Sequence, residues 1–158
     1  MGRSLAARKS LAVAAGAAAA AALTGIPTQA PTALADDPVC GATVCGFLLP
    51  SRQGSCEINY GRGPDVPDSA YCTWTDRITA YSATLSPAGV LQSCANPVAA
   101  VDSMCQSDPP LGQPTLAAGQ RAAIGPFSCQ ADADTVTCTV VASGRGFTLS
   151  GAGIVPVR

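Results

Sequence analysis

The stretch "FSCQADADTVTC" contains two cysteines, Cys129 and Cys138, with eight residues between them. This pair is the clearest indication of chemistry in the sequence. Such a pair can bind a metal, act as a redox pair or form a structural disulfide. Redox and zinc sites favour Cys-x-x-Cys, which the chain lacks, and it has no histidine. Asp132 and Asp134 are not followed by the further ligands of a calcium loop, and aspartate at a hairpin tip is typical of turns. We therefore interpret the stretch as a hairpin closed by a disulfide.

The hairpin has a definite register. A two-residue turn at Ala133-Asp134 places Cys129 opposite Cys138 on the same face as Val136. Directly opposed residues of a non-hydrogen-bonded pair lie about 4.5–5.5 Å apart, which is within reach of a disulfide.

The other six cysteines are assigned with decreasing support. The same opposed-strand logic joins Cys56 to Cys72 around the loop "GRGPDVPDS", and the last four cysteines follow by loop closure and elimination. A crossed pairing of those last four is the alternative. The expected disulfides are Cys129–Cys138, Cys56–Cys72, Cys94–Cys105 and Cys40–Cys45.

The start of the chain predicts a Sec-type signal peptide. Basic residues within positions 3–9 precede an alanine-rich uncharged run at 11–23, and Ala33-x-Ala35 precedes Asp36. The run is too short to span a bilayer comfortably, and no later stretch is long or apolar enough to do so. We expect cleavage after Ala35 and secretion, to the medium or the cell envelope.

The expected organisation is a signal peptide at 1–35, a short N-terminal lead-in at 36–44 and one disulfide-rich β domain at 45–158. Cleavage removes three of the nine basic residues and none of the ten acids, so the mature chain is mildly acidic. This charge argues against nucleic acid as a partner. All eight cysteines lie in the mature part, and an even count suits an oxidising compartment.

Short apolar-alternating stretches bounded by Gly, Pro, Asp and Ser predict an all-β fold, a small disulfide-stapled antiparallel sheet or barrel-like domain with long loops. Threonines alternate with Val136, Cys138 and Val140, which is typical of a sheet with one face in water. A long loop is expected at 95–120, with room for a short helix near 98–104. Strands are expected at 47–49, 55–59, 71–74, 78–85, 90–93, 122–130, 135–142, 147–150 and 154–157.

Several blocks of the sequence resemble a family of small secreted actinobacterial proteins classed as a domain of unknown function. "FLLPSRQGSC" is similar to its N-terminal Phe-x-Ser-Pro-Ser-Gly-Asn-Ile-x-Cys motif, and "GPFSC", "VTC" and "SGRGFTL" follow its C-terminal blocks. Arg145 stands where the family commonly has histidine. The resemblance covers roughly residues 45–150 and implies a disulfide-bonded β domain in an exported protein, without implying an activity.

The residue types needed for common catalytic machinery are missing. Without histidine there is no Ser-His-Asp or Cys-His arrangement, and the only lysine lies in the signal peptide. Glu57 is the only glutamate and is expected to face solvent on a strand. The remaining candidate acids for a carboxylate pair lie in loops, where aspartate serves turns: Asp65, Asp68, Asp102 and Asp108. We expect no enzyme, no cofactor and no metal site.

Two non-catalytic functions remain, a binding module for a secreted or cell-envelope protein or glycan and a passive envelope component. Arg62 in the Pro-rich loop 61–69 raises the alternative of a protease inhibitor with a rigid loop, although an ordinary connection is favoured. Trp74, Tyr71 and Tyr60 form a ligand platform if they are exposed together. With so few aromatic residues, a core role is favoured for them.

Arg145 is the sharpest candidate for binding. Glycines on both sides of it in "SGRGF" predict a bend with positive φ or a close backbone approach, while Phe147 anchors the next strand inside. An exposed arginine on a rigid bend can bind a carboxylate or phosphate with two hydrogen bonds. The alternative, which surface turns favour, is an arginine that faces water or pairs with an aspartate such as Asp134.

The exported protein should begin at Asp36, because the small-x-small site ends at Ala35. N-terminal sequencing of the protein recovered from the medium checks this. A full-length species in the medium contradicts it.

Overall fold

The computed structural model describes residues 39–98, 105 and 112–158, and the regular structure of this part is ten β-strands. The predicted signal peptide with its cleavage site, residues 36–38 of the lead-in, residues 99–104 of the expected helix, Asp102 and Asp108 lie outside the described residues. The strands are β1 Val44–Leu48, β2 Gly54–Asn59, β3 Ser69–Thr75, β4 Thr79–Leu85, β5 Leu91–Pro97, β6 Arg121–Ile124, β7 Phe127–Ala131, β8 Val136–Val140, β9 Gly146–Ser150 and β10 Gly153–Val157.

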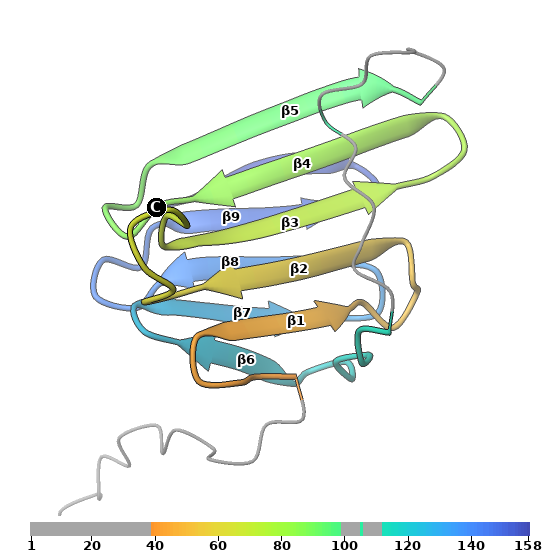
Figure 1. Cartoon of the computed structure of the whole chain (residues 1–158). Coiled ribbons are helices and arrows are strands. Elements are labelled where there is room, and N and C mark those ends of the chain that lie inside the picture. Colours follow the sequence, from red (N-terminus) through yellow and green to blue (C-terminus); the bar gives the residue numbers. More distant parts are fainter. Residues whose placement is uncertain (1–38, 99–104, 106–111) are drawn as a thin grey trace, which may run out of the picture. The chain divides into compact units, whose positions relative to one another are not determined.

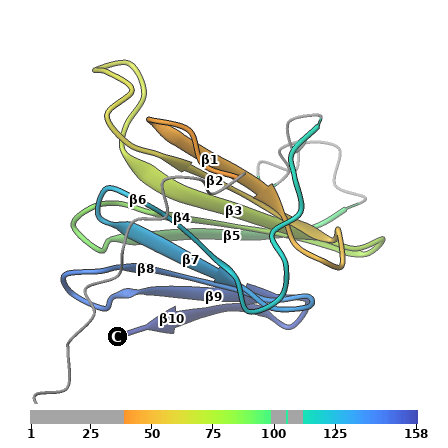
Figure 2. The same cartoon turned by 90° about the horizontal axis from the view of Figure 1, so that it is seen from below.

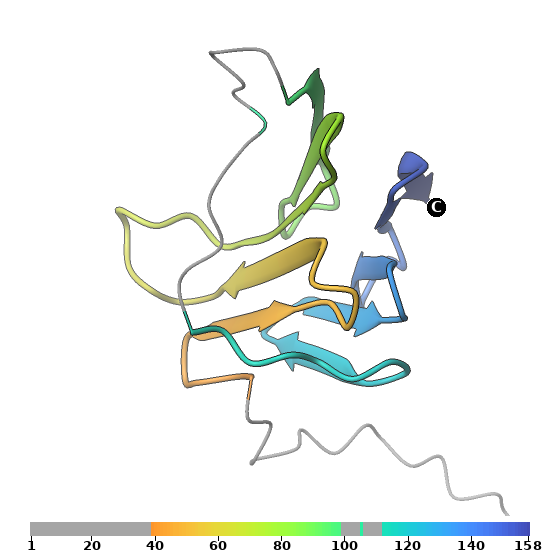
Figure 3. The ribbon, with the colours of Figure 1, turned by 90° about the vertical axis from the view of Figure 1, so that its right-hand side faces the viewer.

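Two antiparallel sheets are formed, and the all-β prediction is confirmed. Sheet 1 has the order β1-β2-β3-β4-β5 and sheet 2 the order β10-β9-β8-β7-β6, so each is a simple meander (Figure 1). The sheets lie face to face as two layers, seen from below in Figure 2 and from the side in Figure 3. Among the described residues we find no helix that is able to cross a membrane.

The layers do not close into the barrel that was one form of the predicted fold. The outer edge of β1 is instead occupied by a returning segment, because Leu48 N–H donates to the Pro114 carbonyl and Leu116 N–H donates to the Leu48 carbonyl (2.8 and 3.0 Å). At two of the other edges, Pro97 in β5 and Pro156 in β10 have no N–H to donate. Edge strands interrupted in this way remain edges.

Strict alternation of side chains builds the core between the layers. All three phenylalanines of the chain, Phe47, Phe127 and Phe147, point inward and are fully buried. Leu49, Ile58, Leu85, Leu149 and Val136 complete the set of the largest fully buried side chains. The prediction that Phe147 anchors β9 from the inside is confirmed.

The hairpin of β7 and β8 has the expected register. Cys129 lies opposite Cys138, and Ala131 lies opposite Val136. A disulfide joins Cys129 to Cys138, whose Cα atoms are 4.0 Å apart. In sheet 1 a disulfide joins Cys56 of β2 to the directly opposed Cys72 of β3, with a Cα–Cα distance of 4.1 Å.

These two disulfides meet at the centre of the layered core. The Sγ atoms of Cys72 and Cys138 are 3.5 Å apart, and both residues are fully buried. Both sulfurs are in disulfides and carry no proton, so this is a packing contact between the sheets. The Sγ atoms of Cys56, Cys72 and Cys138 lie within 4.8 Å of one another, but none is the thiolate that a metal requires.

The remaining disulfides lie outside this centre. Cys40–Cys45 closes a short loop at the start of β1, and the crossed alternative is not the pairing in the structure. Cys94 lies opposite Ser82 on the outer face of sheet 1 and is joined to Cys105, which is fully buried. Residue 105 is thereby held against that outer face.

One predicted strand was wrong. Residues 122–130 form two strands, β6 and β7, with Ile124 paired to Phe127 across a tight turn. Gly125 has φ +55°, a left-handed conformation that other residues rarely adopt, and Pro126 lacks an N–H for a ladder. In addition, β5 runs on to Pro97, so the long connection begins later than expected.

The turn between β3 and β4 is organised by one carboxylate. Asp76 Oδ1 accepts hydrogen bonds from the N–H groups of Ile78 (2.6 Å) and Thr79 (2.7 Å). The bonds from Thr79 and Ile78 lower the pKa of Asp76, because they stabilise its charged form.

The first prediction from the fold concerns the two central disulfides. Cys56→Ala/Cys72→Ala and Cys129→Ala/Cys138→Ala should each lower the free energy of unfolding by about 2–5 kcal/mol. The two losses should be non-additive by about 0.5 kcal/mol or more, because the sulfurs touch. Urea unfolding of both double variants and of the quadruple variant measures this. Cys40→Ala/Cys45→Ala is the control, since its closed loop is short; strict additivity contradicts the prediction.

The second prediction from the fold concerns the pH dependence of stability that Asp76 produces. Its lowered pKa means that its stabilising effect is present above the unfolded-state pKa of about 3.9 and is lost as the pH falls through the lower folded-state value. Asp76→Asn keeps an acceptor oxygen but no charge, so it should remove this part of the acid dependence. Asp76→Ala should lower the melting temperature at neutral pH as well. Melting temperatures from about pH 2 to 7 test both; an unchanged acid profile in Asp76→Asn contradicts the assignment.

Candidate binding surface

Four turns gather at one end of the layered strands. They are the β2–β3 loop at 60–68, the β4–β5 turn at 86–90, the β6–β7 turn at 125–126 and the β8–β9 turn at 141–145. Figure 1 shows all four at the left of the view, because the strands of the two meanders run in similar directions. We call this region the turn end.

Contacts between the layers fix these turns relative to one another. The ring of Tyr60 lies directly against Gly125, where the Cβ of any other residue would collide with it. The Val141 N–H donates to the Pro126 carbonyl (2.8 Å), which joins two turns of sheet 2. The turn end is therefore one connected structure and not four independent loops.

Arg145 is built into the same structure by three glycines. A Cβ on Gly89 would lie 3.2 Å from the Cβ and 3.3 Å from the Cδ of Arg145, so the arginine stem crosses the β4–β5 turn. Gly144 has φ +69°, and Gly146 packs against the Cys138 carbonyl with no room for a side chain. The predicted positive-φ bend and close approach are both present.

The guanidinium of Arg145 remains exposed. The only ion pair among the described residues joins Arg62 to Glu57, so no carboxylate there neutralises Arg145. The alternative of a pair with Asp134 is wrong, because Asp134 precedes β8 and Arg145 follows it, at opposite ends of that strand.

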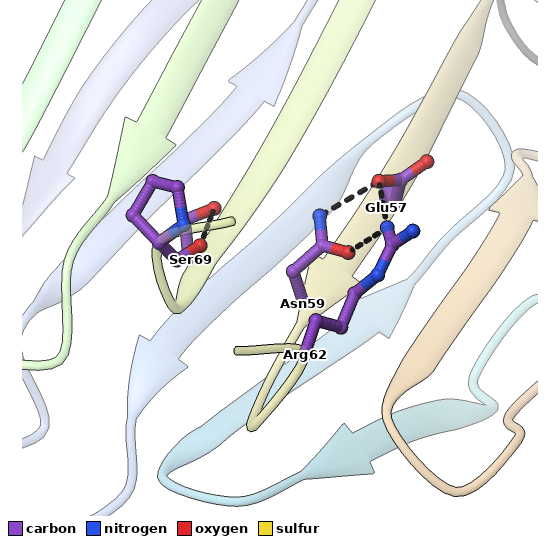
Figure 4. A network of polar contacts seen from close by, with 5 residues as sticks. Glu57, Asn59, Arg62 and Ser69 are labelled. Carbon is purple, nitrogen blue, oxygen red and sulfur yellow. Dashed lines mark hydrogen bonds and ion pairs between the residues drawn. The ribbon is translucent and has the colours of Figure 1, made fainter. Parts of the chain in front are cut away.

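Arg62, the second predicted arginine, is held back against sheet 1. Its Nη1 donates to Asn59 Oδ1 (2.7 Å) and lies 3.7 Å from Glu57 Oε1, which in turn accepts from Asn59 Nδ2 (2.7 Å; Figure 4). Asp68 Oδ1 accepts from the Gly61 N–H (2.7 Å) and closes the base of the loop. These contacts fit an ordinary anchored connection better than a loop that presents Arg62 to a protease.

The three aromatic residues do not form a platform. Trp74 is only 5% exposed and packs against Gly151 and Tyr81, with ring centroids of Trp74 and Tyr81 6.0 Å apart. Its Nε1 is buried and has no hydrogen-bond partner in the described structure. Tyr71 is half-buried on sheet 1, and Tyr60 alone is exposed. Trp74 is therefore a core residue, far along β3 from the turn end.

Apolar side chains are exposed at the turn end as well. Tyr60 (41%), Val90 (56%) and Val141 (62%) all lie there, whereas Ile78 and Val155 are exposed elsewhere. Exposed apolar residues beside an unneutralised arginine are typical of recognition surfaces. Val90 and Val141 were not among the sequence candidates, since single valines next to turns carry no distinctive pattern.

Next to the turn end, the outer face of sheet 2 is hollowed. An open hollow of about 350 Å³ is lined by Arg121, Ser128, Gln130, Thr137, Thr139 and Val141. The alternation of threonines with apolar residues in β8 indicated this outer face, but no sequence pattern links those threonines to Arg121 and Gln130, which come from neighbouring strands. The strand pairing supplies that link.

Comparisons with known proteins did not identify a relative of this chain. The sequence matches no protein-family model, and neither a curated protein nor a solved structure matches it. The resemblance to the secreted actinobacterial family therefore stays a prediction.

Proposed function

We propose that the chain is exported and that its β domain is a non-catalytic binding module whose turn end recognises a secreted or cell-envelope protein. The observation that carries the proposal is that Arg145, which has no ion-pair partner among the described residues, and several exposed apolar residues lie on the same group of turns. These turns are held together by contacts between the two sheets. The four disulfides support an oxidising, extracellular setting.

The chemistry of the turn end defines the partner. Val90, Val141 and the ring of Tyr60 offer apolar area, and Arg145 offers a planar cation that favours a carboxylate. The partner surface should therefore combine apolar side chains with an acidic group. Because the turns are already fixed by contacts between the layers, little conformational entropy is lost on binding.

The alternatives receive less support. An inhibitor would need a freely presented loop, and Arg62 is bonded back to Asn59 and Glu57. An enzyme would need reactive groups held together. The described residues show one ion pair, Glu57–Arg62, and the Asp76 carboxylate is engaged in organising a turn. A passive envelope component predicts no partner at all.

The experiment uses the exported protein, immobilised and oxidised, to capture proteins from culture filtrate and from cell-wall extract. The captured protein is identified and its affinity measured by titration with wild-type and variants. Arg145→Ala and Val90→Ser should each weaken binding by about tenfold or more, as truncation of central interface residues does. Their melting temperatures should change little, because both side chains are exposed.

Arg77→Ala and Ile78→Ser are the matched controls. They remove the same kinds of group, a guanidinium and a branched aliphatic side chain, from exposed positions on the β3–β4 turn at the opposite end of the strands. Binding that survives in the controls and is lost in the turn-end variants supports the proposal. Equal affinity in all variants, or no captured protein, overturns it.

A further inference from the structure

The hollow on sheet 2 has a regular composition. The outward side chains of one row across the strands are Arg121, Gln130, Thr137 and Thr148, since these residues are paired in register from β6 to β9. A second row contains Ser128 opposite Thr139. Neighbouring strands lie about 4.7–4.9 Å apart, so hydroxyl and amide groups repeat at that interval across the face.

The polar groups of the first row are already oriented by one another. Arg121 Nη2 donates to Gln130 Oε1 (3.2 Å), which leaves the amide nitrogen of Gln130 free to face a ligand. The hydroxyls of Thr137 and Thr148 are 2.9 Å apart and hydrogen-bonded. A ligand therefore meets donors and acceptors with set directions and not freely rotating groups.

Charge in the hollow has one sign. Arg121 is the only ionisable residue that lines it, and among the described residues no carboxylate forms an ion pair with it. The nearest acids along the chain, Asp132 and Asp134, are exposed on the β7–β8 turn beyond the end of the lining residues. Arg121 is paired with Gln130 and so lines the end of the hollow nearest that turn, where its charge attracts an anion and the two aspartates oppose one.

We propose that this hollow binds an acidic glycan, with a sugar carboxylate on Arg121 and sugar hydroxyls on the Ser, Thr and Gln side chains. Sugar hydroxyls donate and accept hydrogen bonds, as the groups that line the hollow do, and Val141 gives an apolar contact for the C–H face of a ring. The guanidinium can bind a carboxylate with two parallel bonds. A volume of about 350 Å³ lies within the usual size of ligand sites, about 300–1,000 Å³.

The inference is independent of the turn-end proposal. The two surfaces share only Val141, so Val141 is left out of both sets of variants. Loss of glycan binding in hollow variants with retained protein binding, or the reverse, separates the two.

The test is calorimetric titration of the exported protein with trigalacturonate, with maltotriose and with inorganic phosphate. Trigalacturonate should bind saturably, and at least tenfold more tightly than the neutral maltotriose or phosphate alone. Arg121→Gln should weaken trigalacturonate at least tenfold, whereas Arg77→Gln, an exposed arginine outside the hollow, should not. Thr137→Val and Thr139→Val, which keep side-chain shape, should each weaken it severalfold. Asp132→Asn should tighten it by reducing repulsion.

Each contrary result is decisive. If maltotriose binds as tightly as trigalacturonate, the carboxylates do not contribute to recognition. If phosphate binds as tightly as trigalacturonate, the sugar does not contribute. Equal effects of Arg121→Gln and Arg77→Gln show that binding is non-specific. Absence of saturable binding overturns the site. If Arg121→Gln fails to fold, the two threonine variants decide, since their hydroxyls lie on the outer face.

Discussion

The contact between the sulfurs of Cys72 and Cys138 is the constraint on which the rest of the domain depends. Each disulfide joins directly opposed residues of a hairpin inside its sheet, and a one-residue slip would turn the cysteine to the outer face. The two bonds therefore fix both registers. Their contact also fixes how closely the sheets approach, because two sulfurs fill the space between β3 and β8 where larger side chains stand elsewhere, such as Phe47 and Phe147.

Close approach at the centre has consequences at the turn end. Turns of facing sheets come together there, and glycine is needed wherever a side chain crosses the opposite backbone, as Tyr60 crosses Gly125 and Arg145 crosses Gly89. The exposed position of Arg145 thus follows from core geometry: its stem is pressed on a turn of the other sheet while its charged group has no carboxylate partner in the described part of the chain.

Local patterns were enough to predict the β class, the Cys129–Cys138 register and the bend at Arg145, because each depends on residues close in sequence. The sequence did not distinguish an open sheet from a barrel, since closure depends on edges set by Pro97, Pro156 and the segment that pairs with Leu48. The prediction of a single strand at 122–130 was wrong because the alternation of apolar and polar residues continues through the β6–β7 turn, which leaves no mark in that pattern. The hollow was missed because its residues meet only through the pairing of three strands.

The two outer faces show why similar side chains have different roles. On sheet 1 the hydroxyls of Ser55 and Thr73 bond each other at 3.0 Å and are nearly buried, on the face to which Cys94 tethers residue 105. On sheet 2 the corresponding hydroxyls of Thr137 and Thr148 also bond each other, yet they stay accessible. Covered hydroxyls can only satisfy one another, whereas open ones retain capacity for a ligand. The surfaces proposed for ligands, on sheet 2 and at the turn end, thus follow from which faces stay open and not from composition.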